Sequence, residues 1–315
     1  MKVVVAGGSG FLGRHVVDAL VDGGHQAVVL SRGNRECTDR DNVEYVACDV
    51  AAGQLPLDAL RECDALVNLI GIKHETAGQT FAMAHVESTK QLIAAAREAG
   101  VQRCVHISVV AARPDPHHAY HDTKWQAEQL VRNSGLDFTI LKPGVIYGPG
   151  DDMITHLVKM IRFCPLFPVV GRGTSILQPV SGADVARVVV AALQREIAIG
   201  QTYEVVGPDA LMLRDVVRTV AAGIPLSVWI LPTPIWFQRT AVWAMSVLFR
   251  NPLSTPAQLQ MLIDGLAGDP QPVERDLGIQ TQPFLAERIA EVQASIPPLF
   301  GLTLRILRGC GSYHR

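Results

Sequence analysis

Residues 3–15 read Val-Val-Val-Ala-Gly-Gly-Ser-Gly-Phe-Leu-Gly-Arg-His, and this stretch decides the fold. A short apolar run leads into three evenly spaced glycines, and an apolar pattern with helical period follows over residues 13–22. Glycines allow a tight turn close to a ligand, and a helix N-terminus offers free N–H groups and the positive end of its dipole. The stretch therefore predicts a strand, loop and helix that bind a pyrophosphate. The candidate binding residues are Gly7, Ser9, Gly10, Phe11, Leu12 and Gly13.

The first half of the chain alternates apolar runs with helical patterns. The expected strands are 2–6, 27–30, 43–47, 65–70, 103–107 and 138–141, and the expected helices are 13–22, 57–62, 81–99 and 121–133. Apolar strands joined by helical crossovers are typical of a parallel sheet that is covered on both faces. We therefore predict an α/β fold, a doubly wound parallel sheet of the Rossmann type with a smaller, mostly helical C-terminal lobe.

This rhythm changes after Pro143. We expect residues 1–150 to form the dinucleotide-binding domain, with 175–207 returning to it through a helix and a strand. Residues 151–174 and 208–315 would form the second lobe, over the carboxyl edge of the sheet where α/β proteins bind ligands.

Composition limits the function classes. The 315 residues carry a formal net charge of -2, which argues against a nucleic-acid partner bound through a basic field. The six cysteines include no C-x-x-C pair, so no metal site is expected from them. The N-terminus enters a strand directly, without a signal peptide, and we expect a cytoplasmic protein.

The end of the second expected strand bears on the choice of cofactor. An NAD-preferring site would place an acidic residue here, to bind the ribose 2′-hydroxyl. Ser31 and Arg32 stand there instead, and a guanidinium suits a 2′-phosphate. We expect NADP(H), with NAD(H) as the alternative. Further candidates along the same sheet edge are Asp49, Val50, Asn68 and Gly71.

Together these residues resemble the short-chain dehydrogenase/reductase superfamily in its extended and atypical, epimerase/dehydratase-like branches. Within them the chain is similar to the group related to the nucleotide-binding accessory subunit of respiratory complex I. The resemblance rests on residues 7–13, 67–71, 85–89, 106–108, 120–124, 142–143, 147–152, 178–186 and 203–208. It implies an NAD(P)-binding Rossmann domain, with Pro143 among the cofactor-binding residues. The group includes reductases, non-catalytic subunits and factors tied to quinone metabolism or photosystem assembly, so the resemblance does not define a substrate.

Tyr120 and Lys124 are the candidate catalytic pair. Four residues apart on an expected helix, they lie on one face. Hydride transfer to a carbonyl needs a proton donor, and we expect the ammonium of Lys124 to lower the pKa of Tyr120. The superfamily gives the pair this role, and its lysine also holds the nicotinamide ribose.

The third catalytic position departs from the superfamily pattern. A Ser or Thr hydroxyl usually follows the fifth strand, whereas this chain has Val109 there and Ser108 one position early. A shift of one residue turns a strand side chain to the other face. Ser108 is therefore either a catalytic hydroxyl brought round by the loop or a residue bonded to the local turn.

Other polar groups invite a metal interpretation that the spacing does not favour. His117, His118 and His121 lack a carboxylate or cysteine at ligand spacing, so we interpret them as a solvated loop. We interpret Asp151 and Asp152 as the cap of the helix that follows, in preference to a metal-binding pair of carboxylates.

Three tryptophans recur every seven residues in the second lobe, at Trp229, Trp236 and Trp243. The accompanying helix, from near Pro234 to near Arg250, is short for a bilayer. We favour a helix packed on the core of the lobe. The alternatives are the wall of an apolar substrate site and a helix lying in a membrane interface, as a peripheral contact. The tail 299–315 is either a second basic contact or a frayed terminus.

Two functions follow. The first is an NADP(H)-binding oxidoreductase that transfers a hydride between nicotinamide and a carbonyl or enone of an apolar small molecule. The second is a non-catalytic nucleotide-binding subunit or assembly factor of a membrane redox complex. Tyr120 and Lys124 favour the first, and Val109 favours the second. An epimerase or dehydratase is disfavoured, because those relatives keep the hydroxyl.

Overall fold

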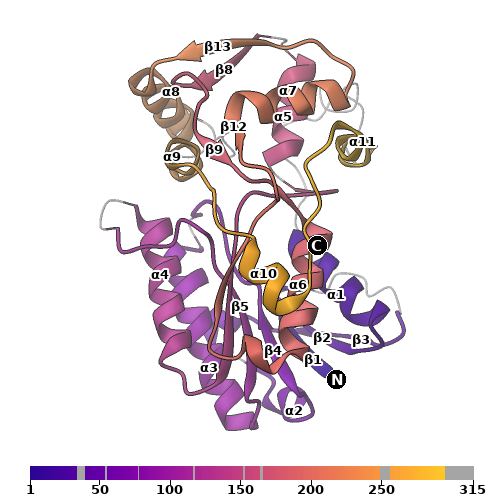
Figure 1. Cartoon of the computed structure of the whole chain (residues 1–315). Coiled ribbons are helices and arrows are strands. Elements are labelled where there is room, and N and C mark those ends of the chain that lie inside the picture. Colours follow the sequence, from indigo (N-terminus) through magenta and orange to yellow (C-terminus); the bar gives the residue numbers. More distant parts are fainter. Residues whose placement is uncertain are drawn as a thin grey trace.

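A computed structural model describes residues 1–33, 40–53, 55–76, 78–115, 118–151, 153–163, 166–248 and 256–294. Within these residues a seven-stranded sheet has the order β11-β6-β5-β4-β1-β2-β3, and every neighbouring pair is parallel (Figure 1). The strands are β1 (Lys2–Ala6), β2 (Gln26–Ser31), β3 (Val43–Ala47), β4 (Ala65–Asn68), β5 (Arg103–Ile107), β6 (Asp137–Pro143) and β11 (Thr202–Val205). The strand order reverses between β1 and β4. The predicted fold class is confirmed.

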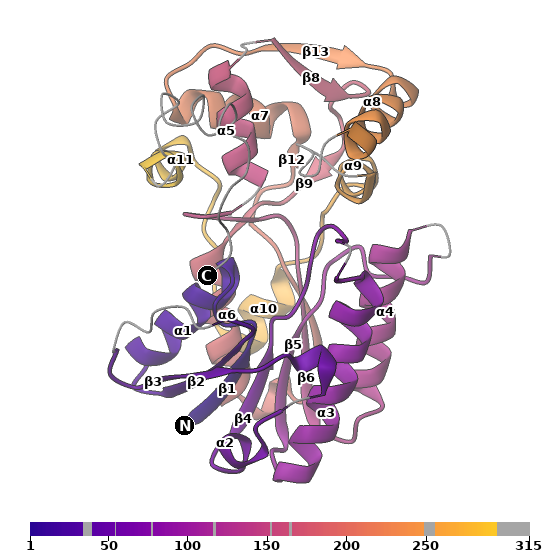
Figure 2. The same ribbon diagram turned by 180° about the vertical axis from the view of Figure 1, so that it is seen from behind.

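Helices cover both faces of this sheet, which explains its apolar strands. Val3, Val4 and Val5 of β1 are fully buried, because successive side chains face opposite helical layers. One layer contains α1 (Phe11–Asp22) and α6 (Gly182–Gln194), and the other contains α2 (Leu57–Arg61), α3 (Ser88–Ala99) and α4 (Ala119–Arg132) (Figures 1 and 2). A π-helical turn, η2 (Ala82–Glu87), runs directly into α3.

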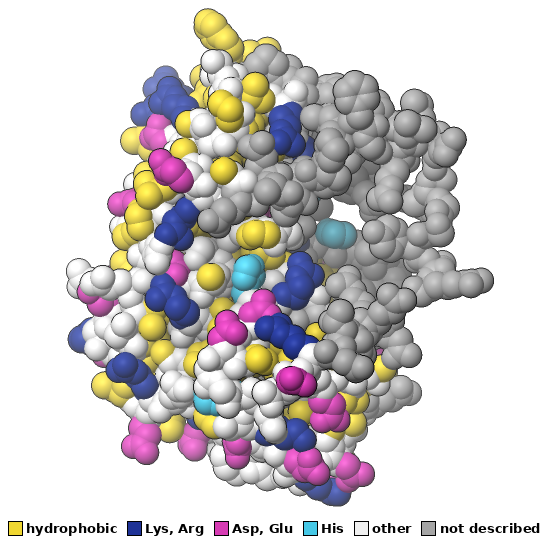
Figure 3. Space-filling model, turned by 90° about the vertical axis from the view of Figure 1, so that its right-hand side faces the viewer, with side chains coloured by type: hydrophobic (Ala, Val, Ile, Leu, Met, Phe, Trp, Pro, Cys, Tyr) yellow, Lys and Arg dark blue, Asp and Glu magenta, His cyan; other side chains and the backbone are white. Residues whose placement is uncertain are grey.

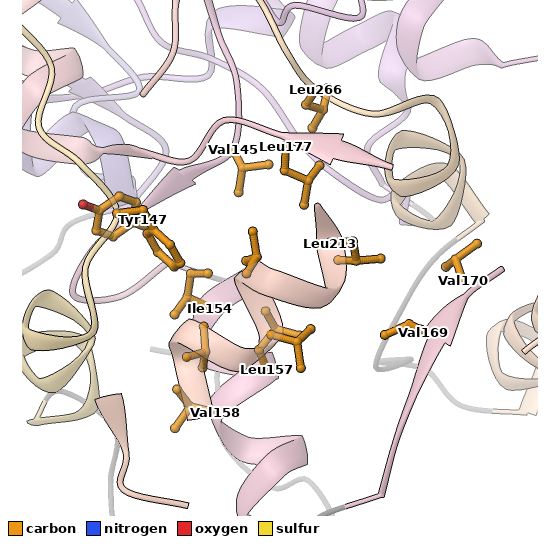
Figure 4. Packing of buried hydrophobic residues seen from close by; sticks show 14 of the residues in the cluster. Val145, Tyr147, Ile154, Leu157, Val158, Val169, Val170, Leu177, Leu213 and Leu266 are labelled. Atoms are coloured by element: carbon orange, nitrogen blue, oxygen red, sulfur yellow. The ribbon is translucent and has the colours of Figure 1, made fainter. Parts of the chain in front are cut away.

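A second lobe, which we call the cap lobe, lies beyond the carboxyl edge of the sheet (Figures 1 and 2). Its described elements are α5 (Met153–Phe163), β8 (Leu166–Val170), β9 (Ile176–Leu177), β12 (Leu211–Met212), α7 (Leu213–Gly223), β13 (Trp229–Thr233), α8 (Ile235–Leu248), α9 (Pro256–Asp264) and α11 (Ala286–Ala294). Helix α7 turns Leu213, Val216, Val217 and Val220 inward, the spacing of a single apolar face. They belong to one buried cluster with Ile154 and Leu157 of α5, and Figure 4 shows Leu213 near these two side chains.

The chain passes between the two lobes more than once. Strands β7 (Ile146–Tyr147) and β10 (Val180–Ser181) pair where it leaves and re-enters the sheet domain. After α9 it returns again, since α10 (Gln271–Leu277) packs on β11 and α6 before α11 rejoins the cap lobe. The division expected from the sequence does not contain this return.

The expected tryptophan helix exists as α8, but its packing differs from the favoured interpretation. Trp229, Trp236 and Trp243 are 74%, 70% and 63% exposed. Among the described side chains of α8, Val242 alone is buried. The interpretation of these tryptophans as core residues is therefore wrong. In the described part of the chain, no helix is long and apolar enough to cross a bilayer.

Candidate functional site

The glycine loop between β1 and α1 leaves no room for side chains at two positions. Gly7 has a φ of +82°, and a Cβ there would lie 3.2 Å from the backbone nitrogen of Ile70 after β4. A Cβ on Gly13 would lie 2.4 Å from the carbonyl oxygen of Gly7. Gly10 is the N-cap residue of α1, and no side chain caps the helix there. The first N–H groups of α1 thus stay available to an anion at the point where the strand order reverses.

Two arginines lie beside this loop. Arg32 follows β2 and is exposed, and within the described ranges no carboxylate pairs with it. Ser31 Oγ donates to the carbonyl of Gly33 at 3.2 Å. Arg14 Nη1 donates to the carbonyl of Ser9 at 3.5 Å, which holds a second guanidinium against the loop. Arg14 therefore lies against the loop, and Arg32 lies exposed at the end of the neighbouring strand β2.

The next two strands end in residues that shape the backbone. Asp49 Oδ1 accepts from the N–H of Ala51 at 3.1 Å, and Val50 is buried. Asn68 is 2% exposed, and its Oδ1 accepts from the N–H of Ile70 at 3.0 Å. Its amide donates to Thr89 Oγ1 at 3.1 Å and to His106 Nδ1 at 3.2 Å. Asn68 therefore holds the turn after β4 that contacts Gly7.

Lys124 reaches the carboxyl edge of the same strands. Its Nζ donates to the carbonyl of Ile107, at the end of β5, at 3.2 Å. A Cβ on Gly71 would lie 3.1 Å from this Nζ, so the turn after β4 and the lysine are in contact. Burial lowers the pKa of Lys124 to about 8. Pro143, at the end of β6, is buried, and its carbonyl accepts from the N–H of Val110 at 3.2 Å.

Tyr120 lies one turn before Lys124 on α4 and is 9% exposed. Its ring makes edge contacts with Phe81 and His85, each with ring centroids 5.5 Å apart. Burial raises the pKa of Tyr120 to about 12. The expectation that Lys124 lowers this pKa is wrong, because desolvation of the phenolate dominates.

Ser108 and Val109 face different surroundings. Ser108 Oγ donates to Glu128 Oε1 at 2.5 Å, and Glu128 also pairs with Lys142 at 3.3 Å. Val109 is buried in the apolar cluster that contains Tyr120. The structure thus brings Tyr120 and Lys124 to one side of α4, and bonds Ser108 to a buried carboxylate further along the same helix.

His118 and Asp151, considered above for metals, bond to other groups, whereas His121 is buried on α4, so its interpretation as part of a solvated loop is wrong. His118 Nδ1 lies 2.9 Å from Asp115 Oδ2, and His117 lies outside the described residues. Asp151 Oδ1 accepts from the N–H of Ile154 at 2.7 Å, which confirms it as the cap of α5, and Asp152 is not described. In the described ranges, no group of three His, Cys, Asp or Glu residues could hold a metal.

His85 is a site residue that the sequence did not single out for a role. Its Nε2 accepts from the N–H of Ile72 at 3.3 Å, so its Nδ1 carries the proton shared with Thr123 Oγ1 at 2.9 Å. Burial lowers the pKa of His85 to about 2, and the neutral ring lies against Tyr120. Its place in a π-helical turn, a distortion frequent at functional sites, is a signal visible only in the structure.

A strand, a crowded glycine loop and an uncapped helix at the reversal of a parallel sheet define a dinucleotide-binding protein of the Rossmann type. The chain belongs to the family described as NAD(P)H-binding, whose model matches residues 7–196. The resemblance and the NAD(P) cofactor expected from the sequence are confirmed.

Curated relatives include both kinds of protein that the resemblance implies. A mitochondrial protein of Arabidopsis thaliana named NADH dehydrogenase [ubiquinone] 1 alpha subcomplex subunit 9 is 29% identical over 67% of this chain. The ceramide reductase of Caulobacter vibrioides is 31% identical over 55% of this chain. The match covers 55% of the length of each relative. Among solved structures, a dTDP-glucose 4,6-dehydratase from Streptomyces venezuelae shares the fold, with a TM-score of 0.74 and 21% identity over 94% of this chain and 96% of that one.

Proposed function

We propose that this chain is an NADP(H)-dependent oxidoreductase that acts on a carbonyl or enone of an apolar small molecule. The observation that carries the proposal is the position of Tyr120 and Lys124. They share one side of α4, and Lys124 is bonded to the carboxyl end of β5 beside the turn that follows β4. A dinucleotide bound at Gly7–Gly13 would extend along this edge.

The residues around the loop suit NADP(H). Gly7 and Gly13 let the loop pack closely on the turn after β4 and on α1, and the exposed Arg32, which no described carboxylate pairs with, would take a 2′-phosphate at the end of β2. When bound, the nicotinamide supplies or accepts the hydride. Ser31, Asp49, Val50, Asn68, Gly71 and Pro143 complete the proposed edge.

The high pKa of Tyr120 favours reduction. With a pKa of about 12, the phenol keeps its proton at neutral pH and can donate it. As the carbonyl carbon of a substrate gains a hydride, its oxygen would take the Tyr120 proton, which converts the carbonyl into an alcohol. Lys124, still cationic below its pKa of about 8, would stabilise the phenolate left behind.

The neighbours of Tyr120 support an apolar substrate. Phe81, Val109 and Ala112 belong to the same buried cluster as Tyr120, and this cluster continues into the cap lobe. In this proposal Ser108 positions α4 through Glu128, and a catalytic role for its hydroxyl would require that bond to break.

One observation favours the second function, a nucleotide-binding subunit or assembly factor of a membrane redox complex. The chain presents Val109, where a hydroxyl would polarise the substrate, and one relative is named as a subunit of such a complex. In that case the site would hold its cofactor without turnover.

Substitution of Tyr120 separates the two functions. NADPH oxidation would be followed with a panel of long-chain ketones and enones, for the native protein and for Tyr120→Phe. Tyr203→Phe is the matched control, because Tyr203 is a buried tyrosine on β11 whose hydroxyl donates to Asp276. The proposal expects turnover that Tyr120→Phe reduces by about a hundredfold or more, with NADPH binding retained. Tight NADPH binding without turnover of any substrate would support the second function instead.

A further inference from the structure

The far end of the cap lobe carries an unusual set of exposed apolar side chains. We call it the tryptophan patch and define it as Leu166 on β8, Trp229 and Leu231 on β13, and Trp236, Phe237 and Trp243 on α8. Each is at least 44% exposed. Figure 1 shows β8, β13 and α8 at the end of the molecule farthest from the sheet, and hydrophobic side chains project there in Figure 3. Large apolar patches of this kind mark interaction sites.

The patch is held as one surface. Trp229 is the register partner of Leu166, and Leu231 follows two residues later on the same side of β13. Gln238 ties α8 to these strands, donating to Thr233 Oγ1 at 2.6 Å and to the carbonyl of Pro168 at 3.4 Å. Residues opposite Gln238 on the helix therefore face outward, and these include Trp236 and Trp243, seven residues apart.

The two stretches of sequence that supply the patch contain no acidic residue, although Asp215, just before the second stretch, pairs with Arg218 at 3.0 Å. The sequence has no Asp or Glu in residues 153–183 or in residues 216–263, the two stretches that supply β8, β13 and α8. The same stretches contain Lys159, Arg162, Arg172, Arg218, Arg239 and Arg250, although the whole chain has a net charge of -2. Arg239 lies three residues after Trp236 and four before Trp243 on α8, and its exposed guanidinium donates to Gln260 Oε1 of α9 at 3.0 Å.

We propose that the tryptophan patch docks this protein on the surface of a membrane that contains anionic phospholipid. Tryptophan prefers the boundary between headgroups and acyl chains, and arginine beside it attracts anionic headgroups. A second copy of the patch, or the C-terminal residues 299–315 with three arginines and no acid, would bring like charge. An anionic bilayer is the partner with complementary charge, and the inference does not depend on the proposed reaction.

The four tryptophans of the chain permit a direct test. Trp125 lies on α4 outside the patch, so Trp125→Phe leaves only Trp229, Trp236 and Trp243 as fluorophores. This reporter would be titrated with vesicles of phosphatidylcholine alone and with mixed phosphatidylcholine–phosphatidylglycerol vesicles, some brominated on their acyl chains. We expect a blue shift and quenching by the brominated lipid with the mixed vesicles.

Sedimentation with the mixed vesicles identifies the residues responsible. The triple variant Trp229→Ser, Trp236→Ser, Trp243→Ser should bind at least about tenfold more weakly, and Arg239→Gln about fivefold more weakly at low salt. Ile197→Ser is the matched control, since Ile197 is 59% exposed but lies in the sheet domain. NADPH binding checks that each variant is folded.

Several outcomes would overturn the proposal. Absence of binding to the mixed vesicles by the native protein would do so, as would equal binding by the triple variant. Tryptophan fluorescence of the Trp125→Phe reporter that is not quenched by brominated lipid would also contradict the proposal. This test does not depend on whether the triple variant folds. A dimer that disappears in the triple variant, without vesicle binding, would assign the patch to a second copy instead.

Discussion

Ser108 Oγ donates a hydrogen bond to Glu128 Oε1 at 2.5 Å, while the next residue, Val109, packs in the cluster of Tyr120. We expect Ser108→Ala to lower the free energy of unfolding by about 1–3 kcal/mol, because the 3% exposed Glu128 loses a donor. NADPH affinity and kcat should be nearly unchanged. Urea denaturation and steady-state kinetics measure both quantities, with Glu128→Gln as a partner variant. A large loss of kcat without a loss of stability would instead make Ser108 catalytic.

Gly13→Ala tests the close packing of the loop on α1. The new Cβ would lie 2.4 Å from the Gly7 carbonyl oxygen and 2.5 Å from Gly8 backbone atoms, so the loop must move. We expect a loss of about 1–3 kcal/mol in unfolding free energy and at least about tenfold weaker NADPH binding. Gly78→Ala is the control and should change neither, because no described atom outside its chain neighbours lies within 4 Å of the new Cβ. Native affinity in Gly13→Ala would rule out a phosphate site at this loop.

Arg32→Gln tests the cofactor preference. Loss of a guanidinium that binds a 2′-phosphate should weaken NADPH binding about 10- to 100-fold and leave NADH binding almost unaltered. Arg61→Gln, an exposed arginine that pairs with Asp58 on α2, should affect neither cofactor. Binding would be followed by nicotinamide fluorescence. Equal affinities of the native protein for NADPH and NADH would count against the preference.

The pH dependence of reduction should report Lys124. Its pKa is lowered to about 8, so the ammonium is present below that pH and is lost above it. Tyr120, with a pKa of about 12, stays protonated over the same range. The value of kcat/KM for reduction should therefore be level below pH 8 and fall about tenfold per pH unit above it. Lys124→Met should have low activity without this descending limb. A flat native profile to pH 10 would show that the charge on Lys124 is not needed.

Much of the sheet domain could be predicted from the sequence because its signals are local. The apolar run before Gly7 and the helical pattern after Gly13 need no distant information, and β1 and α1 lie where they predict. The two-residue period of a strand indicated that Ser108 and Val109 could face different surroundings, but it left the role of Ser108 open. The role of Asp151 as a helix cap could also be predicted, because the cap lies next to its helix in the sequence.

The remaining features depend on what packs against each residue. The period of Trp236 and Trp243 shows that they share a helix face, but not whether another element covers that face. The pKa of Tyr120 follows from its burial against Phe81 and His85, which lie just before and within a π-helical turn that is distant in sequence. The return of α10 to β11 is likewise a tertiary contact without a local signal.

Because the chain crosses between the lobes several times, its elements cannot all pack in the order in which they are synthesised. Helix α11 packs against both α5 and α7, and it is the last described element of the chain. During synthesis, α5 therefore cannot complete its packing until most of the polypeptide, including α11, has been made. The first βαβ unit, whose elements are adjacent in sequence, can form early. During that interval the apolar faces of α5 and α7 are incomplete. We therefore expect the cap lobe to be the last part of the molecule to acquire its native packing, and no single continuous segment of the chain contains all of its elements without also containing α6 and α10.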